Sequence, residues 1–360
     1  MSKEDPIRII DHDGAVLDRD RLGGLDLKED ELRQLYRFLV LARRADVETV
    51  ALQRQGYLAV YGPAQGQEAA SVGSAYALRP NDFMFPTYRE IGAVIVRGVE
   101  VSKFLRYFQG AWHGGEHDVL KHSFGLVTVP VATHVPHAVG WAVGARLDGR
   151  DACALAYFGD GATSKGDFHE GLNFAGVFRA PVLFFCQNNG WAISVPLVKQ
   201  TVGRIWRRAE GYGFPGVLVD GNDVLGVYSV TKEAADRARN EHVPTLIEAL
   251  TYRIGAHTTA DDATRYRSAD EVDEWSRRDP VKRYQRFLER ESLADEAFVV
   301  GVDDEADRFV ARLREEVVTV APKGVEELFR WVFAEPTAEL ARQREEAQAL
   351  WVEEEADRPG

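Results

Sequence analysis

The chain of 360 residues has few cysteines, no excess of positive charge and no long apolar run. Both cysteines, Cys153 and Cys186, lie inside short apolar segments, so we expect buried thiols in a reducing compartment rather than a disulfide. The net charge of −13 lacks the basic face that nucleic-acid binding requires. No apolar stretch reaches the roughly 18 residues of a transmembrane helix. The sequence therefore argues against general nucleic-acid binding and against a membrane span.

The amino-terminal segment, MSKEDPIRII, lacks the features of a targeting sequence. It has neither the apolar core of a secretory signal nor the Arg- and Ser-rich composition of a transit peptide, so we expect a cytoplasmic protein. The remaining composition, 45% apolar and 28% charged, is ordinary for a globular protein. A chain of this length can bury a large core in one or two domains.

Two polar turns follow apolar segments in the middle of the chain. Residues 152–158 (ACALAYF) and 181–186 (PVLFFC) have the length and composition of buried strands. Gly159-Asp160-Gly161 follows the first segment and Asn188-Asn189 follows the second, with apolar residues at helical spacing over 168–175 between them. The turns therefore fall at the carboxyl ends of two parallel strands, where open α/β sheets bind ligands.

The side chains of these turns suit a magnesium ion that carries a diphosphate. Gly-Asp-Gly alone could be only a tight turn, but its pairing with two asparagines at strand ends favours a ligand site. Asp160 offers a carboxylate and Asn189 a carboxamide, and hard oxygen ligands of this kind are those that Mg²⁺ prefers. The backbone N–H groups of Gly161 and Ala162 could approach a phosphate closely.

Two arginines and a histidine extend this interpretation. Taken alone, Arg89 of the Tyr88-Arg89 pair is best explained as a helix-capping arginine with a surface ion pair. Arg253, at the end of a predicted strand, raises the alternative that the two arginines bind a diphosphate together. His257 is then a candidate proton carrier near the phosphate site. Three histidines of a Gly-rich loop lack the spacing and cysteine partners of a zinc site: His113, His117 and His122.

Strands alternate with helices along the chain, which predicts an α/β fold with a parallel sheet and helices on both faces. Two further strands are expected at 216–220 and 244–252. Asp26, with Glu29 three residues on, predicts the start of a long amphipathic helix that ends before Gly56.

With these residues in view, the chain resembles a known family. Residues 159–194 (GDGATSKGDFHEGLNFAGVFRAPVLFFCQNNGWAIS) are similar to the thiamine diphosphate motif of the α subunits of 2-oxo acid dehydrogenase E1 components. Further similar segments follow the family's order at residues 61–69, 86–98, 129–140, 219–224 and 253–268. The resemblance implies a thiamine diphosphate-binding domain over residues 31–335, between an N-terminal arm (1–30) and a C-terminal helical tail (336–360).

The resemblance also implies roles for single residues at the charged end of the cofactor. Asp160 and Asn189 would bind Mg²⁺ through their side chains, and Trp191 through its main-chain carbonyl. The implied diphosphate ligands are Tyr88, Arg89, Arg253 and the N–H groups of Gly161 and Ala162.

At the other end of the cofactor, Val129 and Val131 would line the aminopyrimidine and thiazolium rings. His257 would lie over the reacting carbon, where it helps to bind the 2-oxo acid and to pass the acyl group to lipoyl. The family's regulated serine is replaced here by Thr258, so control by phosphorylation is not expected.

The resemblance further implies partners, because no carboxylate of this chain fits the glutamate that activates the pyrimidine ring. In this family that glutamate comes from a β subunit. We therefore expect a chain that is inactive alone, that forms an α2β2 heterotetramer, and that delivers an acyl group to the lipoyl domain of an E2 transacylase.

The substrate stays open between two kinds of 2-oxo acid. The segments GQEA (66–69), WHGG (112–115), CQNN (186–189) and PLVKQTV (196–202) favour pyruvate dehydrogenase, which is our first expectation. A branched-chain 2-oxo acid dehydrogenase is the alternative. The third and fourth candidates are an acetoin dehydrogenase α subunit and a non-catalytic thiamine diphosphate-binding subunit.

Overall fold

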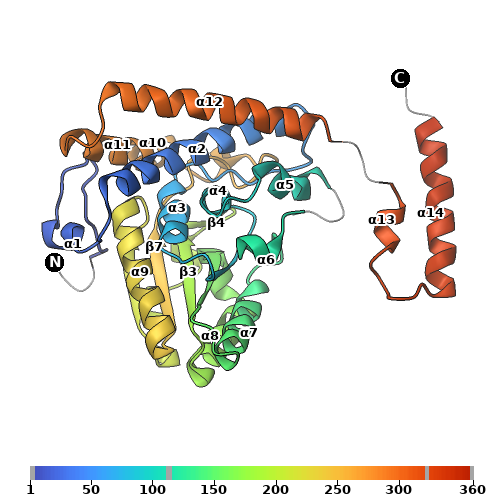
Figure 1. Cartoon of the computed structure of the whole chain (residues 1–360), viewed down its shortest axis with the longest axis horizontal. Coiled ribbons are helices and arrows are strands. Elements are labelled where there is room, and N and C mark those ends of the chain that lie inside the picture. The colour runs from blue at the N-terminus through green and yellow to red at the C-terminus, as the bar shows by residue number, and fades with distance from the viewer. Residues whose placement is uncertain (1–4, 111–115, 321–323, 357–360) are drawn as a thin grey trace.

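The computed structural model describes residues 5–110, 116–320 and 324–356. Its centre is a parallel sheet of five strands in the order β1-β2-β3-β7-β6, with helices on both faces (Figure 1). The predicted α/β fold is confirmed. The strands of this sheet are β1 (Phe83–Phe85), β2 (Ala154–Gly159), β3 (Val182–Asn188), β6 (Gly216–Asp220) and β7 (Thr245–Leu250).

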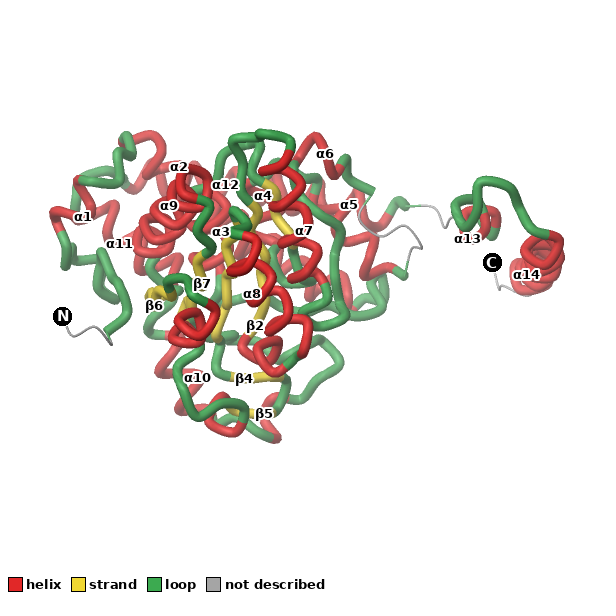
Figure 2. Tube along the Cα trace, turned by 90° about the horizontal axis from the view of Figure 1, so that it is seen from below, coloured by secondary structure: helices red, strands yellow, loops and turns green. Residues whose placement is uncertain are grey.

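The helices vary from single turns to long rods, and Figure 2 shows them around the central strands. Their bounds are α1 Arg19–Gly23, α2 Glu29–Arg54, α3 Glu68–Tyr76, α4 Ile91–Val96, α5 Val101–Leu105, α6 Val119–His122, α7 His134–Leu147, α8 Gly166–Phe178, α9 Val224–Glu241, α10 Ala269–Ser276, α11 Pro280–Arg290, α12 Glu296–Val318, α13 Glu326–Phe329 and α14 Ala338–Ala356. A small antiparallel pair, β4 (Trp191–Ala192) and β5 (Val195–Pro196), follows β3.

Alternate residues of the sheet face two separate cores. On β2, Leu155 and Tyr157 pack with residues of α3, α4 and α9. Ala156 and Phe158 pack on the opposite face with residues of α7 and α8. Because successive side chains of a strand point to opposite faces, both faces of this strand must be apolar, as its sequence is.

The first turn of α2 differs from the prediction. Asp26 has a left-handed backbone, with φ of 56°, and does not cap the helix. The helix begins at Glu29, after Lys28, whose backbone N–H donates to the Glu31 carboxylate at 2.9 Å. The carboxylate that caps the N-terminus of α2 is therefore Glu31, within the helix, and not Asp26 before it.

The N-terminal arm is anchored to the body of the protein. Ile9 and Ile10 are fully buried, and their backbone N–H groups donate to the Asp223 carboxylate at 2.6 and 3.0 Å. Ile7 forms a parallel bridge with Val219 of β6. The arm thus adds a single bridge at the β6 edge of the sheet and buries Ile9 and Ile10 against the body.

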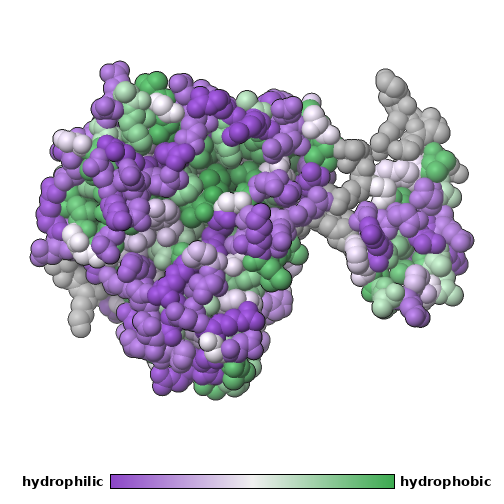
Figure 3. All heavy atoms as spheres, in the orientation of Figure 1, coloured by the Kyte–Doolittle hydropathy of each residue, from purple (hydrophilic) through white to green (hydrophobic). Residues whose placement is uncertain are grey.

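At the other end of the chain, α13 and α14 stand apart from the body (Figure 1). Apolar side chains lie among charged ones on this part (Figure 3), and they include the exposed Trp331 and Phe333. None of the helices in the described part of the chain is long and apolar enough to cross a membrane. The division of the chain at residues 30 and 335 stays a prediction.

Candidate functional site

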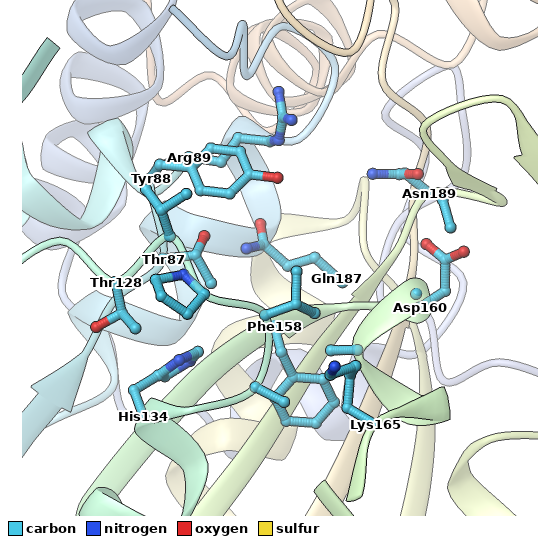
Figure 4. A pocket seen from close by; sticks show the side chains of 18 of the residues that line it. Thr87, Tyr88, Arg89, Thr128, His134, Phe158, Asp160, Lys165, Gln187 and Asn189 are labelled. Carbon is cyan, nitrogen blue, oxygen red and sulfur yellow. The ribbon is translucent and has the colours of Figure 1, made fainter. Parts of the chain in front are cut away.

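A cavity of about 500 Å³ opens at the carboxyl ends of β1, β2 and β3. The segments that follow these three strands supply much of its wall, and the segment before α7 closes another side. This is the place that the two polar turns predict, because parallel strands deliver their carboxyl ends to one edge of the sheet. Figure 4 shows Asp160 and Asn189 together on one side of the cavity and Tyr88 and Arg89 on the other, with Gln187 between.

The structure gathers nearly all of the predicted site residues around this cavity. Those that line it are Tyr88, Arg89, Val129, Val131, Asp160, Gly161, Ala162, Asn189, Trp191 and His257. Arg253 is not among them and is 1% exposed. The roles given to these residues stay predictions.

The acidic turn after β2 is buried and closely packed. Burial raises the pKa of Asp160, and a hydrogen bond from Gln200 Nε2 to its Oδ2, 2.7 Å long, opposes that shift. A Cβ at Gly161 would lie 2.8 Å from the Cβ of Ala192, so only glycine fits there. Gly159, in contrast, has an ordinary extended backbone with φ of −89°, so its conformation does not require glycine.

The two asparagines after β3 point in different directions. Asn188 turns away from the cavity, and its Nδ2 donates to Glu248 Oε1 at 2.6 Å. Asn189 lines the cavity, where its Oδ1 accepts from the Trp191 N–H at 3.1 Å and its Nδ2 donates to Gln67 Oε1 at 3.0 Å. One carboxamide of the pair is therefore available to a ligand, and the other holds the turn.

The basic side of the site contains two buried arginines. Arg89 lies over the Tyr88 ring, with its guanidinium 5.2 Å from the ring centroid, and its Nη2 donates to the His257 carbonyl at 3.0 Å. The Nε and Nη2 atoms of Arg253 have no hydrogen-bond partner within the described residues. Burial, together with the nearby Arg89 and Arg267, lowers the pKa of Arg253 to about 10. Two neighbouring guanidinium groups, one of which has N–H donors without a hydrogen-bond partner, are suited to bind an anion.

His257 is neutral at pH 7. Burial, with help from Arg89 and Arg253, lowers its pKa to about 4. Its backbone N–H donates to Asp261 Oδ2 at 2.9 Å, and the same oxygen accepts from the Tyr266 hydroxyl. The loop that carries His257 is therefore held in place through its backbone, and the neutral imidazole can donate one hydrogen bond and accept another.

The polar residues in the wall of the cavity that sequence reasoning did not place in the site include Gln67, Glu90 and Gln187. Gln67 and Gln187 occur in segments that carry the family resemblance, but nothing in the sequence shows that they meet. They are 120 positions apart, with Gln67 Nε2 3.5 Å from Gln187 Oε1. Only the fold brings them together.

Histidines of the Gly-rich loop have structural partners where they can be described. His117 Nε2 contacts the Phe124 carbonyl at 2.8 Å, and His122 Nδ1 contacts the Arg97 carbonyl at 3.1 Å. His113 and the segment WHGG at 112–115 lie outside the described residues. Over residues 5–110, 116–320 and 324–356, no group of three or more His, Cys, Asp or Glu side chains is placed to hold a metal ion. A metal here would need amide, main-chain and ligand oxygens as well.

Known proteins match the chain over nearly its whole length. Residues 36–322 match the family described as dehydrogenase E1 component. The chain is 46% identical over 346 residues to 3-methyl-2-oxobutanoate dehydrogenase subunit alpha of Mycobacterium tuberculosis (strain H37Rv), covering 96% of this chain and 94% of the relative. It is 37% identical over 347 residues to pyruvate dehydrogenase E1 component subunit alpha of Staphylococcus aureus (strain N315), covering 96% and 93%. The chain therefore belongs to the dehydrogenase E1 component family, as the alpha subunit of a thiamine diphosphate-dependent 2-oxo acid dehydrogenase.

Proposed function

We propose that this alpha subunit serves a branched-chain 2-oxo acid dehydrogenase and that 3-methyl-2-oxobutanoate is its preferred substrate. The observation that carries this proposal is the identity of 46% to a 3-methyl-2-oxobutanoate dehydrogenase subunit, against 37% to a pyruvate dehydrogenase subunit. Four short segments favour pyruvate, but identity over 346 residues is stronger evidence of the substrate than the residues of four short segments. Pyruvate remains the second candidate substrate.

The residues around the cavity fit thiamine diphosphate and Mg²⁺. Arg253 has buried donors with no partner in the described part of the chain, which a diphosphate would satisfy. At Gly161 the packing leaves no room for a side chain, as close approach of a phosphate to the backbone also requires. Asp160 and Asn189 offer one carboxylate and one carboxamide, to which Mg²⁺ adds a main-chain carbonyl, diphosphate oxygens and water. In the proposed site, Trp191 supplies the main-chain carbonyl.

The other predicted site residues bind the remaining parts of the cofactor and the substrate. Tyr88, Arg89 and Arg253 hold the diphosphate, with the N–H groups of Gly161 and Ala162. Val129 and Val131 line the rings of the cofactor. Thiamine diphosphate, when bound, supplies the carbon nucleophile and the electron sink that decarboxylation of a 2-oxo acid requires. Neutral His257 binds the 2-oxo acid and moves a proton during acyl transfer.

A second subunit is needed to complete this site. The alpha subunits that this chain resembles imply a beta subunit as partner. Val129, Val131 and Ile193 line the cavity yet are 40%, 47% and 54% exposed, so the apolar side of the cavity is open. We propose that the beta subunit covers this side and supplies the activating glutamate in an α2β2 heterotetramer. The acyl group then passes to the lipoyl domain of an E2 transacylase.

Co-expression with the beta subunit tests the substrate. The comparison is kcat/KM for 3-methyl-2-oxobutanoate and for pyruvate, with an artificial electron acceptor. Differences of one or two methyl groups in an apolar pocket change kcat/KM by about 10- to 200-fold, so a preference of that size for the branched acid is expected. A preference of the same size for pyruvate would restore the second candidate.

A further inference from the structure

A line of buried side chains connects the two sides of the cavity. It runs from Glu90 through Gln187 and Gln67 to Asn189, and all four residues line the cavity and are buried. Gln187 Nε2 donates to Glu90 Oε1 at 2.7 Å, Gln67 Nε2 lies 3.5 Å from Gln187 Oε1, and Asn189 Nδ2 donates to Gln67 Oε1 at 3.0 Å. Each bond of this relay uses the amide nitrogen of one residue and an oxygen of the next.

The direction of the relay is set at Glu90. One oxygen of its carboxylate, Oε2, accepts from the backbone N–H of Thr87 at 2.7 Å and of Arg89 at 3.3 Å. A backbone N–H can only donate, so this position must be an oxygen. The other oxygen, Oε1, is likewise an acceptor, and Gln187 must turn its Nε2 toward it.

The orientation then passes along the chain of amides. A carboxamide has a donor at one end and an acceptor at the other, so a glutamine that donates to one neighbour presents its oxygen to the next. Gln187 thus presents Oε1 to Gln67, and Gln67 presents Oε1 to Asn189. Asn189 in turn must use Nδ2 for this contact, and its Oδ1 then lies where it accepts from the Trp191 N–H at 3.1 Å. A carboxamide oxygen has two acceptor positions, so one of them stays available to a ligand.

This matters because Mg²⁺ binds amides through oxygen and not through nitrogen. We propose that Glu90, Gln187 and Gln67 are positioning residues that orient the Asn189 carboxamide so that its oxygen faces the metal. The inference rests on the proposed function, since it assigns no role unless Asn189 is a metal ligand. Partners of this kind, which hold a metal ligand without touching the metal, typically change metal affinity by about 10- to 100-fold when mutated.

A substitution of nearly identical shape tests the relay. Glu90→Gln keeps an oxygen for the backbone N–H groups of Thr87 and Arg89, so its new amino group faces Gln187. The relay is then reversed, and the Gln67 amino group faces the Asn189 amino group. Asn189 must either turn its nitrogen toward the metal and lose the hydrogen bond from the Trp191 N–H, or keep two donors facing each other, and both outcomes disturb the metal ligand. In the complex with the beta subunit and thiamine diphosphate, we expect the affinity for Mn²⁺, measured by electron paramagnetic resonance, to fall about 10- to 100-fold.

Asn189→Asp provides the matched rescue, because a carboxylate presents oxygen in both orientations. The double variant Glu90→Gln/Asn189→Asp should recover most of the Mn²⁺ affinity, and the four proteins form a double-mutant cycle. Thermal unfolding without metal is measured in parallel. The inference is overturned if Glu90→Gln lowers the unfolding temperature but leaves Mn²⁺ affinity unchanged, or if Asn189→Asp brings no recovery. Failure of the wild-type complex to bind Mn²⁺ would instead remove the proposed metal site, and the relay with it.

Discussion

At the scale of the residue, the site holds a buried positive charge with no acidic partner among the residues that the structure describes. Arg253 is 1% exposed, and two of its nitrogens have no partner in the part of the chain that is described. Arg89 and Arg267 add like charge nearby and lower its pKa. Such an arrangement costs stability in the free protein and would stabilise a diphosphate in the proposed site.

Arg253→Met should therefore separate stability from binding. Without cofactor, the variant is expected to be more stable than the wild type, by about 1–3 kcal/mol, because it removes buried donors that make no hydrogen bond. Its affinity for thiamine diphosphate should fall at the same time. Urea unfolding of the free chain and cofactor titration of the complex measure the two effects, and a free variant less stable than wild type would show that Arg253 is paired.

His257 gives a prediction for pH. Its pKa is about 4 in the folded chain, below the usual value of 6.5, so between these two values the unfolded chain binds a proton that the folded chain does not. Protonation thus favours unfolding as the pH falls through this range. The wild type should lose stability from pH 7.5 to pH 5 more steeply than His257→Asn, which lacks the titrating group. Urea unfolding of both at the two pH values is the measurement, and parallel losses would contradict the shifted pKa.

At the scale of the element, the site depends on short segments whose backbone is held by hydrogen bonds from buried side chains. The segment before α3 is held by Asp46 of α2, whose carboxylate accepts from the Tyr61 hydroxyl at 2.7 Å and from the backbone N–H groups of Ala64 and Gln65 at 2.7 and 3.2 Å. The Gln65 carbonyl in turn accepts from the Ile254 N–H at 2.9 Å, beside Arg253. One buried carboxylate therefore holds the segment before Gln67 and, through the Gln65 carbonyl, the segment that carries Arg253.

Asp46→Asn should destabilise the chain, although the side chain keeps its shape. Its new amino group must face a donor that the carboxylate oxygen now accepts from, and a buried donor left without a partner costs about 1–3 kcal/mol. Asp30→Asn, on the same helix but with a side chain 97% exposed, is the control and should change the free energy of unfolding little. Equal effects of the two substitutions on urea unfolding would show that Asp46 is not an anchor.

The strands and their polar turns were predictable from sequence because each depends on local residues. Apolar segments predicted β2 and β3, and the turn after each reaches the site as expected. The burial of Ile9 and Ile10 was not predictable, since it depends on Asp223, which is far along the chain. The contacts of Gln67 with Gln187 and Asn189 were missed for the same reason, because the two segments that meet there are about 120 positions apart.

At the scale of the whole molecule, the open side of the cavity is the feature that separates this chain from a complete enzyme. Asp160, Arg89 and His257 come from one chain and surround one end of the proposed cofactor site. Exposed valines, Val129 and Val131, line the other end. In the proposed function, the beta subunit brings the glutamate that activates the cofactor to this open side.

The release of CO₂ from 3-methyl-2-oxobutanoate tests this most directly. It is measured with thiamine diphosphate, Mg²⁺ and an artificial electron acceptor, for this chain alone, for the beta subunit alone and for the two together. Only the mixture should release CO₂ above the rate without enzyme. Release by this chain alone at the rate of the mixture would contradict a site shared between two subunits.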